Sequence, residues 1–297
     1  MNLLRFLLIF LILISLLVYL FLSRAPLNKV TTTGELPKLY PYPIIVENPQ
    51  EPAEISAKSA IIIDAKTGVS LFEKDPDTRH LPASTTKLLT AIVVQERCDP
   101  QKVVKVERVV KEGTQMGLFE GDLVTVGNLL YGLLVASGND AAFVLADSCS
   151  DSYIHFIVSM NQKAKELGMK NSHFVNPAGF DDPLQYSTAR DLAKLAKVAV
   201  ANLQIAKIVA TRSIVVTDQL KIRTYYLKNI NKLLGEVEGI EGIKTGQTEG
   251  SLEILVTKTT RRDHTIITAV LGSSDRFNES KQLIEWAFAN HRWISPQ

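Results

Sequence analysis

Few of the residues that build metal sites and histidine-based active sites are present in this sequence. Only two cysteines occur, Cys98 and Cys149, and the five histidines are scattered without metal-ligand spacing. No Gly-x-Ser-x-Gly motif is present, so a serine–histidine–acid triad is poorly supported. We therefore expect neither a metal nor a cofactor.

Neither sign of charge is in excess. The chain carries 33 lysines and arginines against 31 acidic residues, for a net charge of +2, and it has no basic run with interleaved aromatic residues. This balance gives no reason to expect a nucleic-acid partner. Hydrophobic residues make up 46% of the 297 positions, which is enough for the core of one large domain, or of a domain with a subdomain.

The sequence leaves the state of the two cysteines open. In an exported protein they could pair with each other. They could equally be small, buried apolar residues.

The first residues predict a membrane anchor. An apolar run over residues 6–22 is interrupted only by Ser15. At 1.5 Å per residue, a helix of about 20 residues spans the roughly 30 Å of a bilayer's hydrocarbon core. The run is longer than the core of a cleaved signal peptide, and neither an Ala-x-Ala site nor a lipidation cysteine follows it. We expect an uncleaved, single-pass transmembrane helix over residues 1–23, in preference to a cleaved signal.

Residues 24–55 are expected to form a linker. They hold half of the twelve prolines of the chain, and proline-rich segments are semi-extended. We expect one folded domain over residues 56–297, with regular structure starting near Ser59.

Secondary-structure signals in this domain come in three blocks. β-rich runs at 60–63 and 69–72 flank a turn, helical spacing dominates 84–210, and short β-rich runs then precede a last helix over 278–289. The predicted fold is mixed α/β. The first hairpin pairs with the last strands in one mostly antiparallel sheet, helices cover its faces, and the middle of the chain forms a helical subdomain.

The stretch from Ala83 to Ala91 carries the first candidate site. Pro82 precedes it and apolar residues follow, as expected for a buried helix that begins near Ser84. Residues three apart on a helix are neighbours, so Ser84 and Lys87 share one face, with a hydroxyl nucleophile beside an amine that could act as its base. By itself, a Ser-x-x-Lys match is most often a capping serine with a solvated lysine.

Two later motifs change this interpretation. Ser137-Gly138-Asn139 follows an apolar helix, and Lys244-Thr245-Gly246 enters a predicted strand. In this order the three motifs resemble those of the serine penicillin-binding proteins and the related β-lactamases. The flanking sequences narrow the resemblance to the D-alanyl-D-alanine carboxypeptidase family, over about Ser59 to Trp286. The flanks that carry it are Gly121–Val126, Leu129–Leu134, Phe174–Gly179, Tyr186–Leu192 and Asn229–Leu234.

This resemblance implies a β-lactamase/transpeptidase-like fold. It also implies a serine-type D-Ala-D-Ala carboxypeptidase that acts on the pentapeptide stems of peptidoglycan and is acylated by β-lactam antibiotics. Ser84 would be the nucleophile and Lys87 its base. Ser137 would relay a proton toward the leaving amine, and Asn139 would offer its amide to the substrate backbone.

The third motif would bind substrate. By the same resemblance, Lys244 and Thr245 would receive the carboxylate of the peptide, and Gly246 would let substrate lie against the strand edge. The N–H groups of Ser84 and Gln247 would form the oxyanion hole. This chemistry puts the catalytic domain on the extracytoplasmic side of the cell membrane.

Lys87 can accept a proton only if its amine is neutral. Burial and a second cation, Lys244, would both lower its pKa from the usual value of about 10.4.

Two further motif matches are interpreted as decoys. Lys66-Thr67-Gly68 lies in the turn of the first hairpin, where its residue types suit the turn itself. Ser159-Met160-Asn161 is interpreted as an exposed polar stretch. It interrupts a helix that we expect to pack through Ile154, Phe156, Ile157 and Val158.

Two alternatives are retained. A β-lactamase needs a base that hydrolyses the acyl-enzyme, usually from a Glu-x-x-x-Asn stretch, but Glu166 is followed at that spacing by Lys170. A penicillin-binding sensor or scaffold without activity is disfavoured, because every catalytic residue type is present. The sequence does not separate carboxypeptidase from endopeptidase or weak transpeptidase activity.

Overall fold

The computed structural model describes Leu7, Phe10, residues 13–15, Val18 and residues 40–296. The chain divides into residues 1–39 and a compact unit of residues 40–297. Among the described residues, no helix is both long and apolar enough to cross a membrane. Most of the anchor predicted for residues 1–23 lies outside the described residues, so it stays a prediction.

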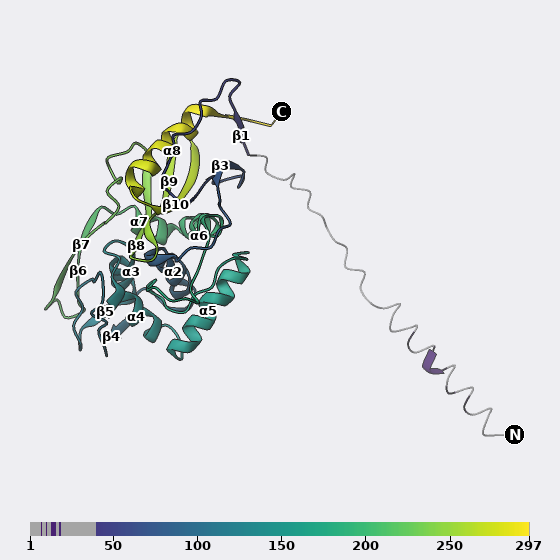
Figure 1. The fold of residues 1–297 in the computed structure, drawn as a ribbon. Coiled ribbons are helices and arrows are strands. Elements are labelled where there is room, and N and C mark those ends of the chain that lie inside the picture. The colour runs from purple at the N-terminus through teal and green to yellow at the C-terminus, as the bar shows by residue number, and fades with distance from the viewer. Residues whose placement is uncertain (1–6, 8–9, 11–12, 16–17, 19–39, 297) are drawn as a thin grey trace. The chain divides into compact units, whose positions relative to one another are not determined.

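A five-stranded antiparallel sheet forms the centre of the compact unit (Figure 1). Its strands, in spatial order, are β3 (Ser70–Lys74), β2 (Ser59–Asp64), β10 (His264–Ser273), β9 (Leu252–Arg261) and β8 (Ile240–Thr248). The expected pairing of the first hairpin with the last strands is confirmed, because β2 pairs with β10 over its whole length. The strand that carries the third motif, β8, lies at the edge of the sheet.

Both faces of the sheet are covered, as the continuous apolar run of β2 suggests. Ile61 and Ile63 belong to the core on the side of the main helical region, whereas Ala60 and Ile62 pack toward the last helix. Successive side chains of a strand point to opposite faces. A strand buried on both faces therefore reads as an unbroken hydrophobic run rather than an alternating one.

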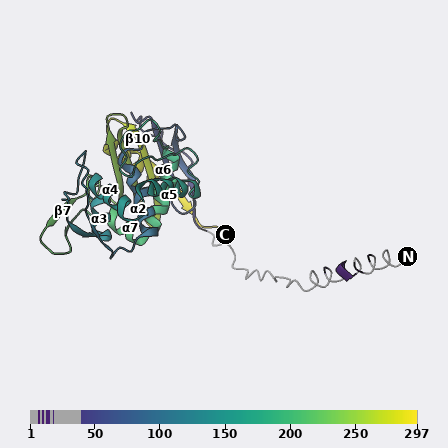
Figure 2. The same ribbon diagram turned by 90° about the horizontal axis from the view of Figure 1, so that it is seen from below.

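Among the described residues, seven α-helices follow the first hairpin of the sheet. They are α2 (Thr86–Arg97), α3 (Val126–Leu134), α4 (Asn139–Ser148), α5 (Tyr153–Glu166), α6 (Ala189–Ala201), α7 (Leu203–Val209) and α8 (Arg276–Asn290). α2 packs against α3, α4, α5 and α6, and Figure 2 shows it among the other helices. α6 and α8 pack on opposite faces of the sheet.

The linker prediction is wrong at its C-terminal end. β1 (Tyr42–Ile45) pairs antiparallel with β11 (His291–Ile294), and Trp286 Nε1 donates a hydrogen bond of 2.6 Å to Gln50 O. Residues 40–55 thus belong to the folded unit. A two-stranded sheet has free edges, and these tolerate a proline such as Pro43. The residue that pairs with Pro43 is Trp293, about 250 residues later in the sequence.

Several short elements are absent from the sequence-based prediction. These are α7, β11 and two small antiparallel pairs, β4 (Val103–Lys105) with β5 (Leu123–Thr125) and β6 (Ser213–Thr217) with β7 (Thr224–Lys228). The one exception is the middle of β6, which lies in one of the short β-rich runs expected before the last helix. Runs of three to seven residues carry little periodicity, so local pattern alone rarely distinguishes them from loops.

The inner face of α5 also differs from the prediction. Ile154 and Val158, expected to pack inward, are 72% and 60% exposed. The buried residues are Phe156, Met160 and Ala164, spaced four apart along one face. Met160, expected in an exposed polar stretch, is therefore a core residue.

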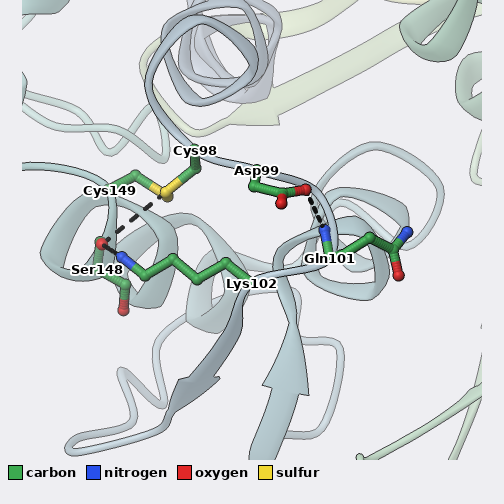
Figure 3. Close-up of a disulfide and its surroundings, with 6 residues drawn as sticks. All are labelled: Cys98, Asp99, Gln101, Lys102, Ser148 and Cys149. Atoms are coloured by element: carbon green, nitrogen blue, oxygen red, sulfur yellow. Dashed lines mark hydrogen bonds between the residues drawn. A yellow bond between two sulfur atoms is a disulfide. The ribbon is translucent and has the colours of Figure 1, made fainter.

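A disulfide joins Cys98 to Cys149, which decides what the sequence left open. The two residues cap the C-terminal ends of α2 and α4. Lys102 Nζ donates a hydrogen bond of 2.8 Å to Ser148 O beside the bridge (Figure 3). The cross-link therefore ties together the far ends of two helices that begin near Ser84 and at Asn139.

We expect the disulfide to stabilise the fold substantially. It closes a loop with a sequence separation of 51, for which the chain-entropy model gives about 4 kcal/mol. Urea denaturation of the wild type and of the Cys98→Ser/Cys149→Ser variant measures the difference directly. The free energy of unfolding should fall by several kcal/mol in the variant. Equal unfolding midpoints for the two proteins would show that the bridge constrains nothing in the unfolded chain.

Candidate active site

The first motif lies at the junction between η1 (Ala83–Thr85), a turn of 3₁₀ helix, and α2. Ala83 adopts a left-handed conformation with φ of 44°, and its carbonyl oxygen lies so near Gly179 that a Cβ there would come within 1.8 Å. Only glycine fits at that contact. The predicted helix start at Ser84 is correct to within two residues, because α2 begins at Thr86. The loop of Gly179 packs against the turn that carries Ser84.

Lys87 lies one turn after Ser84, in the first turn of α2, and has no exposed surface. Its Nζ is 2.8 Å from Ser84 Oγ, 2.7 Å from Asn139 Oδ1 and 2.7 Å from Ala178 O. The last two atoms can only accept hydrogen bonds. A neutral amine has two N–H groups and one lone pair, so donation to these two acceptors leaves the lone pair for the hydroxyl proton of Ser84.

The surroundings favour this neutral form. Burial, followed by the nearby charge of Lys244, holds the pKa of Lys87 well below its usual value, and the carboxylate of Asp140 opposes the shift. The sequence-based expectation of a depressed pKa, caused by burial and by Lys244, is therefore confirmed in direction and in cause.

The second and third motifs meet in a separate pair. Lys244 Nζ donates hydrogen bonds of 2.8 Å to Ser137 Oγ and 3.0 Å to Thr245 O. Both Lys244 and Ser137 are almost fully buried. Burial, together with the guanidinium of Arg276, lowers the pKa of Lys244 to about 7. A hydroxyl in contact with a lysine that titrates near neutrality can pass a proton in either direction.

Asn139 links Lys87 to a neighbouring loop. Its Oδ1 accepts from Lys87, while its Nδ2 donates to Glu112 O at 2.8 Å. Sequence reasoning assigned this amide to the substrate backbone. The structure shows it holding Lys87 in addition, and Nδ2 keeps a second hydrogen that substrate could accept.

β8 carries the third motif past Ser84. A Cβ on Gly246 would lie 3.0 Å from Ala83 Cβ and 3.3 Å from Ser84 N, so the strand approaches the start of α2 as closely as a glycine allows. Thr245 is buried and Gln247 is exposed. The oxyanion hole between the N–H groups of Ser84 and Gln247 stays a prediction.

Arg276 is a site residue that sequence reasoning missed. It starts α8, is only 7% exposed, and its Nη1 donates to Gly246 O at 2.9 Å and to Gln247 Oε1 at 3.2 Å. A signal was available, because a cation in the first turn of a helix opposes the helix dipole. Here the arginine holds β8 through its bonds to Gly246 and Gln247.

Asp140 was also missed. Its buried carboxylate accepts backbone hydrogen bonds of 2.8 to 3.0 Å from Met116, Gly117 and Leu118. The carboxylate therefore fixes the loop whose neighbouring carbonyl, that of Glu112, anchors Asn139.

The decoy motif in the first hairpin behaves as expected. Thr67 N and Thr67 Oγ1 both donate to Asp64 Oδ1, at 2.6 and 2.7 Å. These bonds close the turn between β2 and β3, so Lys66-Thr67-Gly68 serves the turn.

Comparison with known proteins agrees with this arrangement. The family described as D-alanyl-D-alanine carboxypeptidase matches residues 45–275. The chain belongs to the D-alanyl-D-alanine carboxypeptidase family of serine peptidases. The resemblance inferred from the three motifs is therefore confirmed, with the match beginning in β1 rather than at Ser59.

Several relatives of this family are similar to the chain over most of its length. D-alanyl-D-alanine carboxypeptidase DacF of Bacillus subtilis is 34% identical over 79% of the chain, and DacC of Escherichia coli is 32% identical over 86%. The matched regions cover 63% and 67% of those two proteins, so the chain spans about two thirds of their length.

A solved structure confirms the fold. The Streptomyces K15 DD-transpeptidase is 32% identical and superposes with a TM-score of 0.77, over 81% of this chain and all of that one. The predicted β-lactamase/transpeptidase-like α/β fold is thus correct for the compact unit.

Replacement of Lys87 tests its role as the base. Arginine keeps the positive charge but does not deprotonate, so Lys87→Arg should slow acylation by penicillin about 10²–10⁴-fold. In the wild type, acylation requires neutral Lys87. The rate should therefore rise with pH through the lowered pKa and level off well below pH 10.5.

The matched control is Lys66→Arg, the same exchange in the decoy motif, which should leave the acylation rate unchanged. Stopped-flow labelling with a fluorescent penicillin gives the rates, and circular dichroism checks that each variant is folded. Near wild-type acylation by folded Lys87→Arg would show that the base lies elsewhere.

Proposed function

We propose that the protein is a serine-type D-Ala-D-Ala carboxypeptidase that acts on the stem peptides of peptidoglycan and is also acylated by β-lactam antibiotics. The observation that carries the proposal is the contact of 2.8 Å between Lys87 Nζ and Ser84 Oγ, beside which Asn139 and Ala178 engage both N–H groups of a neutral Lys87 amine. Family membership and the named carboxypeptidase relatives support the substrate class.

Each residue then has a defined task in acylation. Ser84 Oγ attacks the carbonyl carbon of the penultimate D-alanine while Lys87 Nζ takes its proton. The C–N bond to the last D-alanine breaks, and the leaving nitrogen receives a proton from Ser137 Oγ, which Lys244 replenishes. Water later hydrolyses the ester on Ser84. Thr245 and Lys244 bind the carboxylate of the leaving residue.

Two other readings receive less support. The carboxylate of Glu166, which a β-lactamase would need near the acyl-enzyme, lies at the exposed end of α5 and pairs with Lys163 at 2.7 Å. A sensor without activity would not require Lys87 and Lys244 to be buried at lowered pKa beside two serines.

Mass spectrometry of a pentapeptide stem tests the activity. Protein comprising residues 40–297 should remove one alanine from the peptide, and Ser84→Ala should reduce the loss to background. Nitrocefin should acylate Ser84 and turn over slowly. Rapid nitrocefin turnover without alanine release would identify a β-lactamase instead. Acylation by nitrocefin with neither nitrocefin turnover nor alanine release would identify a sensor.

We also propose that the N-terminal segment anchors the protein in the cell membrane as a single-pass helix, with the catalytic unit on the extracytoplasmic side. The apolar run over residues 6–22 supports the anchor. The disulfide supports the side, because such bonds persist in oxidising compartments outside the cytoplasm.

Fractionation of cells that express the full chain tests this placement. The protein should stay with membranes after a carbonate wash, retain Met1 to Leu22, and be degraded by protease added to spheroplasts. A mature N-terminus near Arg24 would instead identify the run as a cleaved signal.

A further inference from the structure

Asp140, the second residue of α4, carries a carboxylate with no exposed surface. Its Oδ1 accepts hydrogen bonds from Met116 N at 2.8 Å and from Ala141 N at 2.9 Å. Its Oδ2 accepts from Gly117 N at 2.8 Å and from Leu118 N at 3.0 Å. In the part of the chain that the structure describes, no lysine, arginine or histidine forms an ion pair with this carboxylate. Four backbone donors and the positive end of α4 therefore stabilise its charge.

The loop that Asp140 holds also supplies the two carbonyl groups that fix Asn139. Asn139 N donates to Thr114 O at 2.7 Å, and Asn139 Nδ2 donates to Glu112 O at 2.8 Å. These bonds leave Asn139 Oδ1 turned toward Lys87 Nζ, 2.7 Å away. The orientation of the amide that engages Lys87 thus depends on a loop whose position Asp140 sets.

The glycine of the second motif shows how closely this loop is held. A Cβ on Gly138 would lie 2.7 Å from Asp140 Oδ1 and 2.8 Å from Met116 N, and these two atoms share a hydrogen bond. Both distances are too short for a real Cβ contact, so a side chain at this position would separate Asp140 from the loop. The bond between Asp140 and the loop therefore accounts for the glycine between Ser137 and Asn139.

Two charged groups act on the amine of Lys87 in addition to burial. Burial has the largest effect on the pKa of Lys87, Lys244 on β8 lowers this pKa further, and Asp140 on α4 raises it. No other titratable residue of α2, of the helices packed against α2 or of β8 contributes to this balance. These other residues are Glu96, Arg97, Tyr131, Asp147, Tyr153, His155, Lys163, Lys165, Glu166, Arg190, Asp191, Lys194, Lys197 and Glu241.

We propose that Asp140 is a positioning residue for acylation, because its hydrogen bonds to residues 116–118 keep Asn139 turned toward Lys87. The inference rests on the proposed function and adds to it a residue that has no surface exposed to substrate. The same carboxylate acts a second time through its charge, which opposes the combined effect of burial and Lys244 on Lys87. A base works best when its pKa lies near the operating pH, so a carboxylate that limits the decrease keeps the amine basic enough to take a proton.

The pH profile of acylation tests this role. Stopped-flow labelling of the full-length protein with a fluorescent penicillin, over about pH 5 to 10, gives the limiting rate and the pH at which the rate is half-maximal. Asp140→Asn removes the charge and replaces one acceptor oxygen by a donor. The limiting rate should fall about 10- to 100-fold, because small displacements of catalytic groups cost this much. The half-maximal pH should decrease by about half a unit or more, because the pKa of Lys87 falls when the carboxylate is lost.

A second variant separates the geometry of Asp140 from its charge. Asp140→Glu keeps the negative charge but moves the carboxylate by one methylene, so it cannot make the same set of bonds to residues 116–118. It should lower the limiting rate about 10-fold or more and leave the half-maximal pH close to that of the wild type.

The matched control is Asp122→Asn, the same exchange at a buried carboxylate that binds the other end of the loop. Asp122 Oδ2 accepts from Phe119 N and from Tyr225 Oη, each at 2.7 Å, and Asp122 Oδ1 pairs with Arg223. Asp122 does not contribute to the pKa of Lys87. The control should lower the midpoint of thermal unfolding and leave both the limiting rate and the half-maximal pH unchanged.

The outcomes separate this inference from the proposed function. Wild-type rate and pH profile in folded Asp140→Asn, or an equal change of both in Asp122→Asn, would reduce Asp140 to a structural residue while the proposed function stands. If Asp140→Asn does not fold, a wild-type limiting rate in Asp140→Glu overturns the inference, and failure of both variants to fold overturns it as well. If the wild type forms no penicillin adduct and releases no D-alanine, the proposed function itself fails.

Discussion

A lysine amine with no access to water is the constraint on which the rest of this structure depends. Lys87 carries the reactive contact to Ser84, and a buried ammonium is costly unless its donors are satisfied. Asn139 and the carbonyl of Ala178 supply two acceptors, and Ser84 Oγ is the third polar neighbour of the amine. When the amine is neutral, the first two acceptors engage both of its N–H groups and its lone pair faces the hydroxyl of Ser84, as the proposed general base requires.

Holding these acceptors in place occupies residues far from one another in the sequence. Asn139 is fixed by the carbonyl of Glu112, and that loop is fixed by the carboxylate of Asp140. The disulfide ties the far ends of α2 and α4, the helices that begin beside Ser84 and at Asn139. β8 brings Lys244 to Ser137 from the C-terminal part of the chain, and Arg276 holds this strand by a hydrogen bond to Gly246 O. Preorganisation of this kind avoids rearrangement during the reaction.

The motifs were readable because their chemistry is local. Ser84 and Lys87 are one helical turn apart, so spacing alone sets their contact. The main strands and long helices were also predictable, since each buries a continuous or periodic apolar face. By contrast, β1 and α7 are short, and the role of Arg276 depends on a strand 30 residues earlier in the chain. The exposed face of α5 shows the same limit of sequence-based prediction. Ile154 and Val158 are apolar yet exposed, because apolar content alone does not say which face of a helix packs against another element.

The sequence by itself determined the candidate serine, the two lysines, the order of the motifs and, through the family resemblance, the class of fold. The motifs follow from residue types at fixed short spacings, and the main strands and long helices follow from hydrophobic periodicity. Only the tertiary structure decided that the cysteines pair, that residues 40–55 belong to the folded unit, and that Asn139 anchors Lys87. Burial and pairing depend on which distant segments the fold brings together, and no local pattern records that.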